Sequence, residues 1–287
     1  MSGSLPFLDH CGPLFAAYDL LLCDVWGVIH NGVESFPAAY GALQRARQQG
    51  KTVLMISNSP RPTEAVVPQL DGLKVPRDSY DGMVTSGDVT RAVIVDRPGQ
   101  RVFHLGPPRD LPIYAGIDVK LTDAETADYV VCSGLFDDTR ETPEDYWVLC
   151  ERMHARGLFM LCANPDVVVE RGNDLVYCAG AIADLYKSMG GDVLYAGKPY
   201  APIYQRALAF AGNLRAGDVP LSRVLAIGDS VRTDLKGAEA AGLDFLFLTG
   251  GIHSGEIGGA GGPDAKALAL FLKDHRTPKA VMRGLAW

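Results

Sequence analysis

The chain has no excess of basic residues. Its 27 Lys and Arg are outnumbered by 34 Asp and Glu, which gives a formal net charge of −7 at pH 7 and a pI near 5.4. A protein that binds nucleic acid normally presents a basic surface, so we expect no nucleic-acid partner. An acidic chain can still bind an anionic substrate where a metal ion or local Lys and Arg offset the charge.

Long apolar runs and paired cysteines are also missing. No run approaches the roughly 20 apolar residues of a membrane-spanning helix, and Met1 to Ser4 lack the basic region and apolar stretch of a secretory signal. The six cysteines form no CxxC pair, and several lie in apolar runs. This pattern predicts buried free thiols in a reducing cytoplasm, with neither a zinc site nor a disulfide framework.

The segments that are present alternate between strand and helix. With 287 residues, 47% hydrophobic and 21% charged, the chain has the composition of a soluble globular protein of one large or two modest domains. Apolar runs predict strands at 19–23, 52–56, 83–85, 101–103, 129–131, 158–161, 224–227 and 245–248. Helical patterns lie at 36–49, 62–70, 142–156 and 234–241. This alternation predicts an α/β fold with a doubly wound parallel sheet.

We expect residues 87–194 to form an α/β insertion of their own. The remaining segments, 1–86 and 195–287, would then form the core domain, because polar strand ends resume at Gly197-Lys198-Pro199. The glycine-rich stretch 255–262 lacks GxGxxG spacing and predicts a loop.

Polar side chains follow several predicted strands, where ligands of open α/β sheets bind. Each alone has an ordinary explanation as a turn residue, a helix cap or a solvated lysine. Together and in this order they fit one chemistry, phosphoryl transfer to a carboxylate. The residues are Asp24, Ser57, Asn58, Lys198, Asp229 and Asp234.

Phosphoryl transfer to an ionised carboxylate requires a divalent cation that offsets the charge of the phosphate. Mg²⁺ prefers oxygen ligands, so Asp24 and Asp229 are candidate carboxylate ligands and the backbone carbonyl near Trp26 is a third. Asp234 is placed to orient a metal-bound water. The Ser57 hydroxyl, backbone N–H groups and Lys198 would hold and neutralise the phosphate.

The motifs resemble those of the haloacid dehalogenase superfamily. They stand as Leu22-Cys23-Asp24-Val25-Trp26, Met55-Ile56-Ser57-Asn58, Gly197-Lys198-Pro199 and Gly228-Asp229-Ser230-Val231-Arg232-Thr233-Asp234. The chain is similar to the class with a large α/β cap inserted after the second motif, and within it to NagD-type and p-nitrophenylphosphatase-like phosphatases of sugars and nucleotides.

This resemblance implies a Rossmann-like core, a cap, and a role for each matching residue. Asp24 would be the nucleophile and a metal ligand, and Asp229 and Asp234 the other carboxylates of a Mg²⁺ site. Ser57 and Asn58 would contact the phosphate, and Lys198 would neutralise charge. Asn164 and Asp166 would lie on a cap loop that contacts the substrate, a small phosphorylated metabolite. Pairing of two copies through the cap is a further implication.

Trp26 departs from the family pattern, in which an Asp two residues after the nucleophile protonates the leaving oxygen and then activates water. An indole N–H is only a donor, so Trp26 can do neither. Three interpretations remain open: a slow phosphatase or one with another proton source such as His30, a dehalogenase or phosphonatase, and a phospho-ligand-binding protein without catalysis.

Overall fold

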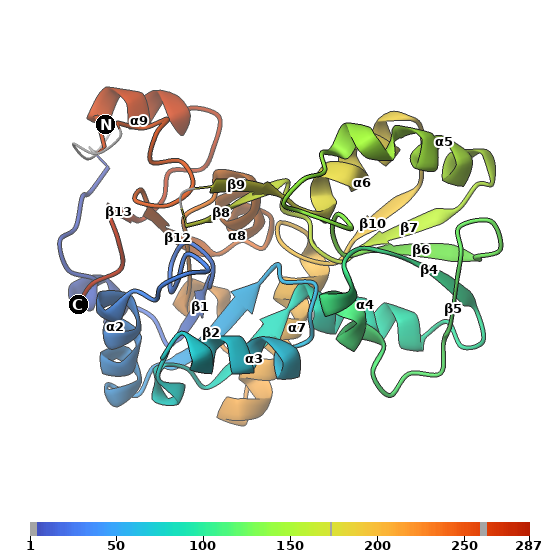
Figure 1. The fold of residues 1–287 in the computed structure, drawn as a ribbon. Coiled ribbons are helices and arrows are strands. Elements are labelled where there is room, and N and C mark those ends of the chain that lie inside the picture. Colours follow the sequence, from blue (N-terminus) through green and yellow to red (C-terminus); the bar gives the residue numbers. More distant parts are fainter. Residues whose placement is uncertain (1–4, 173, 259–262) are drawn as a thin grey trace. The chain divides into compact units, whose positions relative to one another are not determined.

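The computed structural model describes residues 5–172, 174–258 and 263–287, and its contacts divide them into two compact units (Figure 1). Unit 1 takes the described residues up to Ser57, together with Gln69–Val84 and Tyr204–Trp287. Unit 2 consists of Asn58–Pro68 and Thr85–Ile203. The domain boundaries expected from the sequence, at 86/87 and 194/195, stay a prediction.

Unit 1 is built on a sheet whose described strands run in the order β13-β12-β11-β1-β2-β3. β1 pairs in parallel with both β2 and β11, and the pairs β11–β12 and β12–β13 are also parallel. The strands are β1 (Leu20–Cys23), β2 (Thr52–Ser57), β3 (Gly82–Thr85), β11 (Val224–Gly228), β12 (Asp244–Leu248) and β13 (Ala280–Met282). The described helices of unit 1 are α1 (Gly12–Phe15), α2 (Pro37–Gln48), α8 (Lys236–Ala240) and α9 (Ala265–Phe271).

The central strands are buried throughout and almost wholly apolar because both of their faces are covered. Every residue of β1, β2 and β11 is buried, and such continuous burial is typical of parallel sheets between helices. This explains why the unbroken run Leu20-Leu21-Leu22-Cys23 forms a strand without alternating polar residues.

Unit 2 contains a second, wholly parallel sheet in the order β10-β7-β6-β4-β5. Its strands are β4 (Arg101–Leu105), β5 (Lys120–Thr122), β6 (Tyr129–Cys132), β7 (Phe159–Cys162) and β10 (Val193–Tyr195). A separate antiparallel hairpin joins β8 (Val168–Arg171) to β9 (Asp174–Tyr177). The helices α4 (Ser86–Val95), α5 (Trp147–Ala155) and α6 (Ala179–Ser188) belong to this unit. Two further helices, α3 (Thr63–Gly72) and α7 (Ala201–Arg215), contain the points where the chain passes from one unit to the other.

Within unit 2, hydrogen bonds to Asp88 attach the short segment 58–68 to the start of α4. Asp88 completes a capping box with Thr85 at the start of α4, which satisfies N–H groups that a helix start leaves unpaired. The same carboxylate accepts the Thr63 backbone N–H at 3.0 Å and the Thr63 hydroxyl at 2.6 Å.

The structure confirms the α/β fold with parallel sheets and every predicted strand to within about two residues. Two helices differ from their predicted form. The segment 142–156 begins with a 3₁₀ turn (Pro143–Tyr146) before α5, and the segment predicted from Asp234 begins earlier, with a π turn at Val231–Leu235 that precedes α8. The predicted loop 255–262 lies partly outside the described residues, and residues 255–258 are in turns.

The cysteines are the buried free thiols that the sequence predicts. All six cysteines are free and buried, and burial raises the pKa of the Cys11 and Cys150 thiols to about 12, which keeps them protonated. Within the part of the chain that the structure describes, no helix is both long and apolar enough to cross a bilayer.

Leu22→Ala is expected to destabilise unit 1 strongly, because Leu22 is fully buried in the central strand. Removing a buried leucine side chain costs about 2–5 kcal/mol of the free energy of unfolding, which urea denaturation measures. The control is Leu270→Ala on α9, where the side chain is 66% exposed and the expected change is within about 0.5 kcal/mol. Equal losses in the two variants would contradict the assignment of β1 to the core.

Candidate functional site

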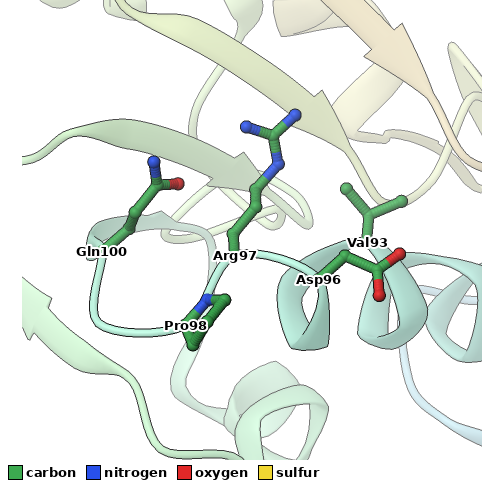
Figure 2. Close-up of a pocket in the computed structure, with 5 residues that line it drawn as sticks. All are labelled: Val93, Asp96, Arg97, Pro98 and Gln100. Carbon is green, nitrogen blue, oxygen red and sulfur yellow. The ribbon is translucent and has the colours of Figure 1, made fainter.

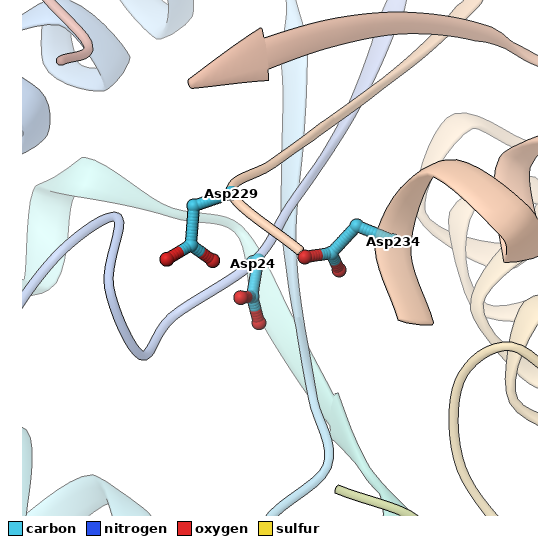
Figure 3. Close-up of side chains that lie close together, drawn as sticks. All are labelled: Asp24, Asp229 and Asp234. Carbon is cyan, nitrogen blue, oxygen red and sulfur yellow. The ribbon is translucent and has the colours of Figure 1, made fainter. Parts of the chain in front are cut away.

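Three aspartates meet at the carboxyl edge of the unit 1 sheet (Figure 3). Asp24 follows β1 and Asp229 follows β11, and these strands are parallel neighbours, so their ends lie side by side. Asp234 reaches the same point from the π turn after β11. Oxygen atoms of the three carboxylates lie within 4.8 Å of one another, and all three residues are buried.

Backbone groups hold the Asp229 carboxylate in a narrow space. Its Oδ2 accepts the Ile252 N–H at 3.0 Å. A Cβ on Gly251 would lie 1.8 Å from that oxygen, and a Cβ on Gly27 would lie 2.2 Å from it. Gly27 also has a φ of +81°, which favours glycine by itself. Glycine at both positions therefore lets two backbone segments close around this carboxylate.

The π turn places Asp234 inside the structure instead of at a helix cap. The Asp234 N–H donates to the Ser230 carbonyl at 3.0 Å, and the Asp234 Oδ2 accepts the Ser230 N–H at 3.2 Å. These two reciprocal bonds close the turn and leave the carboxylate directed toward Asp24 and Asp229 (Figure 3).

The carboxylate cluster suits a hard divalent cation. Two ionised carboxylates at this separation repel by about 3 kcal/mol at an effective dielectric constant near 20, and burial limits the help that water can give. Clustered oxygen ligands of this kind are what Mg²⁺ and Ca²⁺ prefer. The residues present therefore fit a divalent cation, and the part taken by the Trp26 carbonyl stays a prediction.

Trp26 is half-buried and packs on its own loop. Its ring meets the His30 ring edge to face, with centroids 5.0 Å apart, and a Cβ on Gly32 would lie 2.6 Å from the Trp26 ring. The His30 backbone carbonyl accepts the Gly27 N–H at 2.8 Å, and the His30 Nδ1 accepts the Gly32 N–H at 2.9 Å. Trp26 and His30 thus stabilise the loop after Asp24, and a role of His30 as a proton donor stays a prediction.

In unit 2 the predicted residues Asn58, Lys198 and Asp166 form one hydrogen-bonded group. The Asn58 Oδ1 accepts the Lys198 N–H at 2.7 Å, and the Asn58 Nδ2 donates to the Lys198 carbonyl at 3.0 Å and to the Asp166 Oδ1 at 2.9 Å. The Asn164 Oδ1 accepts the Asp166 N–H at 3.1 Å. Both N–H groups of the Asn58 side-chain amide therefore already have acceptors. The predicted contact of Asn58 with phosphate would be made through its backbone N–H.

The predicted site residues fall into two sets. Unit 1 holds Ser57, buried at the end of β2, together with the three aspartates, whereas unit 2 holds Asn58, Lys198, Asn164 and Asp166. Lys198 is 2% exposed, which is unusual for a lysine and indicates a specific role. The joint action of the two sets on one phosphate stays a prediction.

Sequence reasoning missed the segment 249–253 after β12. Its Gly251 and Ile252 contact Asp229, and its His253 accepts a hydrogen bond from the Val231 N–H. The signal was present, because this segment also follows a strand of the same parallel sheet, where functional groups gather.

A pocket of about 460 Å³ in unit 2 does not include any predicted site residue (Figure 2). Its lining consists of Val93, Asp96, Arg97, Pro98 and Gln100. The Arg97 guanidinium lies over the Tyr129 and Phe159 rings, 5.6 and 4.9 Å from their centroids. Arg97 thus packs against the amino-terminal ends of β6 and β7, whereas ligands of such sheets bind at the carboxyl ends.

Comparison with known proteins shows the family. The family model described as haloacid dehalogenase-like hydrolase matches residues 21–120, and a second, described as HAD-hydrolase-like, matches residues 195–274. A crystal structure of a hydrolase of the haloacid dehalogenase-like family from Brucella suis 1330 is 47% identical, covers 97% of this chain and 99% of its own, and superposes with a TM-score of 0.87. The chain therefore belongs to the haloacid dehalogenase-like hydrolases.

More distant relatives bear names of phosphatases. The ribonucleotide monophosphatase NagD of Escherichia coli K12 is 23% identical over 82% of this chain and 88% of its own length. A crystal structure of the glycerol phosphate phosphatase Rv1692 from Mycobacterium tuberculosis in complex with calcium is 25% identical over 83% of this chain and 68% of its own, with a TM-score of 0.62. The resemblance to NagD-type proteins expected from the motifs is thus confirmed.

Gly251→Ala is expected to weaken divalent-cation binding, because the new Cβ would overlap the Asp229 carboxylate. We expect a dissociation constant for Mn²⁺ at least about tenfold higher, equivalent to roughly 1.4 kcal/mol, measured from the electron paramagnetic resonance signal of the free ion. Gly255→Ala, at a glycine shortly after this segment, is the matched control, since a Cβ there meets no atom within 4 Å. Unchanged binding in Gly251→Ala would exclude Asp229 from the cation site.

Proposed function

We propose that the protein is a Mg²⁺-dependent phosphatase that hydrolyses a small phosphorylated metabolite, a sugar or nucleotide phosphate, through an aspartyl-phosphate on Asp24. The observation that carries this proposal is the group of three buried carboxylates at the sheet edge of a haloacid dehalogenase-like hydrolase. Relatives named as a ribonucleotide monophosphatase and a glycerol phosphate phosphatase support phosphate monoesters as the substrate class.

Asp24 would act first, as the nucleophile. One carboxylate oxygen attacks phosphorus while the bond from phosphorus to the ester oxygen breaks, so that the alcohol leaves and Asp24 carries the phosphoryl group. Water then attacks phosphorus, inorganic phosphate departs and the Asp24 carboxylate is regenerated. The proton that the water loses and the proton that the alkoxide gains both require an acid/base group.

Three sets of residues would hold the substrate phosphate and the cation. Asp24, Asp229, Asp234 and the Trp26 carbonyl would hold Mg²⁺, which offsets phosphate charge and so permits attack by an anionic nucleophile. Ser57 and the backbone N–H of Asn58 would bind phosphate oxygens, and Lys198, held by Asn58, would neutralise the charge of the transferring group. Asn164 and Asp166 would contact the rest of the substrate.

Trp26 limits which substrates turn over quickly. A missing acid/base group costs about 10²–10⁴-fold in rate, so substrates whose leaving group needs no proton should suffer least. The lack of an acid/base group at position 26 is also compatible with two other functions. One is a dehalogenase- or phosphonatase-type hydrolase, and the other is a phospho-ligand-binding protein that uses the fold without turnover.

The free cysteines support a reducing cytoplasm as the location of the protein. Pairing of two copies through the insertion stays a prediction from the family resemblance.

Asp24→Asn is expected to abolish hydrolysis of p-nitrophenyl phosphate, and EDTA should abolish wild-type turnover, because nucleophile and cation are both required. This substrate is chosen since p-nitrophenolate leaves without protonation. The control is the exposed residue change Asp118→Asn, which should leave the rate unchanged. Turnover that survives in Asp24→Asn would reject the nucleophile. If the wild type shows no turnover, halide release would favour the dehalogenase, and stabilisation by a phosphate ligand alone would favour the binding protein.

Trp26→Asp is expected to raise turnover of an alkyl phosphate by at least about tenfold, because it restores a carboxyl group that can protonate a poor leaving oxygen. Hydrolysis of p-nitrophenyl phosphate should change much less in its first step. The measurement is the ratio of kcat/KM for the two substrates. A ratio equal to that of the wild type would mean that the missing acid does not limit the reaction.

A further inference from the structure

His253 lies outside the carboxylate cluster, yet both of its ring nitrogens have a defined partner. It belongs to the segment after β12, and its side chain is 11% exposed. Its Nδ1 lies 2.7 Å from the Glu256 Oε1, and its Nε2 lies 3.2 Å from the backbone nitrogen of Val231. The ring also packs against Phe271 of α9, with centroids 4.8 Å apart.

These contacts determine where the imidazole carries its proton. A backbone N–H can only donate, so the Nε2 of His253 accepts the hydrogen bond from Val231. The proton of the neutral ring is then on Nδ1, where it is donated to the Glu256 carboxylate. Glu256 therefore keeps His253 in the tautomer that can accept at Nε2.

Val231 is the first residue of the turn that carries Asp234. The first N–H groups of a helix have no partner within the helix, and His253 supplies one for Val231 from a distant part of the chain. The residue before His253, Ile252, donates its N–H to the Asp229 carboxylate. One short segment thus bonds to both stretches that bear the aspartates after β11.

We propose that His253 is a positioning residue for the divalent-cation site. Through the Val231 N–H it holds the turn that directs Asp234 toward Asp24 and Asp229, and Glu256 preserves the tautomer required for that bond. The pair sets the affinity of the site for the cation without touching the cation or the substrate. The inference rests on the metal site of the proposed function and not on its substrate or its chemical steps.

Two variants of His253 separate the hydrogen bond from packing. His253→Phe keeps a ring against Phe271 but removes the acceptor, whereas His253→Gln places an amide oxygen near the position of Nε2. Loss of one such bond is worth about 0.5–1.5 kcal/mol, so the dissociation constant for Mn²⁺ should rise roughly three- to tenfold in His253→Phe. His253→Gln should stay within about twofold of the wild type, and the Mg²⁺ concentration for half-maximal turnover should follow the same order with kcat at saturating Mg²⁺ nearly unchanged.

The tautomer of His253 gives a second test, which can be made on the wild-type protein and so does not depend on whether a variant folds. In ¹⁵N nuclear magnetic resonance spectra of the wild-type protein, the ring should show a protonated Nδ1 and an unprotonated Nε2. Glu256→Ala should allow the other tautomer to appear and should weaken Mn²⁺ binding in the same direction as His253→Phe.

Either of two results would overturn the inference: a wild-type ring protonated on Nε2, or Mn²⁺ binding in His253→Phe and Glu256→Ala that equals the wild type. Wild-type protein that binds no Mn²⁺ would overturn it as well. A protein that binds Mn²⁺ with the expected order of variants but does not hydrolyse phosphate esters would leave the inference standing and remove the proposed phosphatase activity, so the two failures are distinguishable.

Discussion

Electrostatic repulsion among three buried carboxylates is the constraint on which the rest of the site depends. Asp24, Asp229 and Asp234 are brought within 4.8 Å by two parallel neighbouring strands and one turn. Apolar surroundings could not stabilise three ionised carboxylates at this separation, and a divalent cation would neutralise their charge directly. The surrounding backbone is arranged accordingly, since N–H groups of Ile252 and Ser230 donate to two of the carboxylates.

The buried lysine of unit 2, Lys198, has its backbone held by one side-chain amide. Lys198 is buried, and burying an ammonium group is costly unless it meets compensating charge. The side-chain amide of Asn58 accepts a hydrogen bond from the Lys198 N–H and donates one to the Lys198 carbonyl. The same amide also donates to the Asp166 carboxylate. Asn58 therefore holds both the backbone of Lys198 and the side chain of Asp166. These three residues form one connected hydrogen-bond network.

Trp26 shows how a family site changes when one residue is replaced. The indole packs against His30 and covers the backbone of Gly32, so its bulk belongs to the structure of the loop after Asp24. Unit 1 retains the three carboxylates, and unit 2 retains the buried Lys198. Under the proposed function, the protein would keep the groups for attack on phosphorus and lack the usual group for proton transfer, so the leaving group would distinguish its substrates.

The sequence by itself determined eight of the described strands, the parallel α/β class, the free cysteines and the order of the charged strand ends, because apolar runs and the residues that follow them are local features. It did not reveal β5, β8, β9, β10 or β13. It placed Asp24 and Asp229 at one sheet edge through the rule that parallel strands end together. Only the tertiary structure decided that the Asn58 amide is engaged by Lys198, that Gly27 and Gly251 enclose Asp229, and that His253 supports the turn of Asp234. Each of these contacts joins segments more than 20 residues apart, and their meeting depends on how the chain returns to the sheet, which no local pattern encodes.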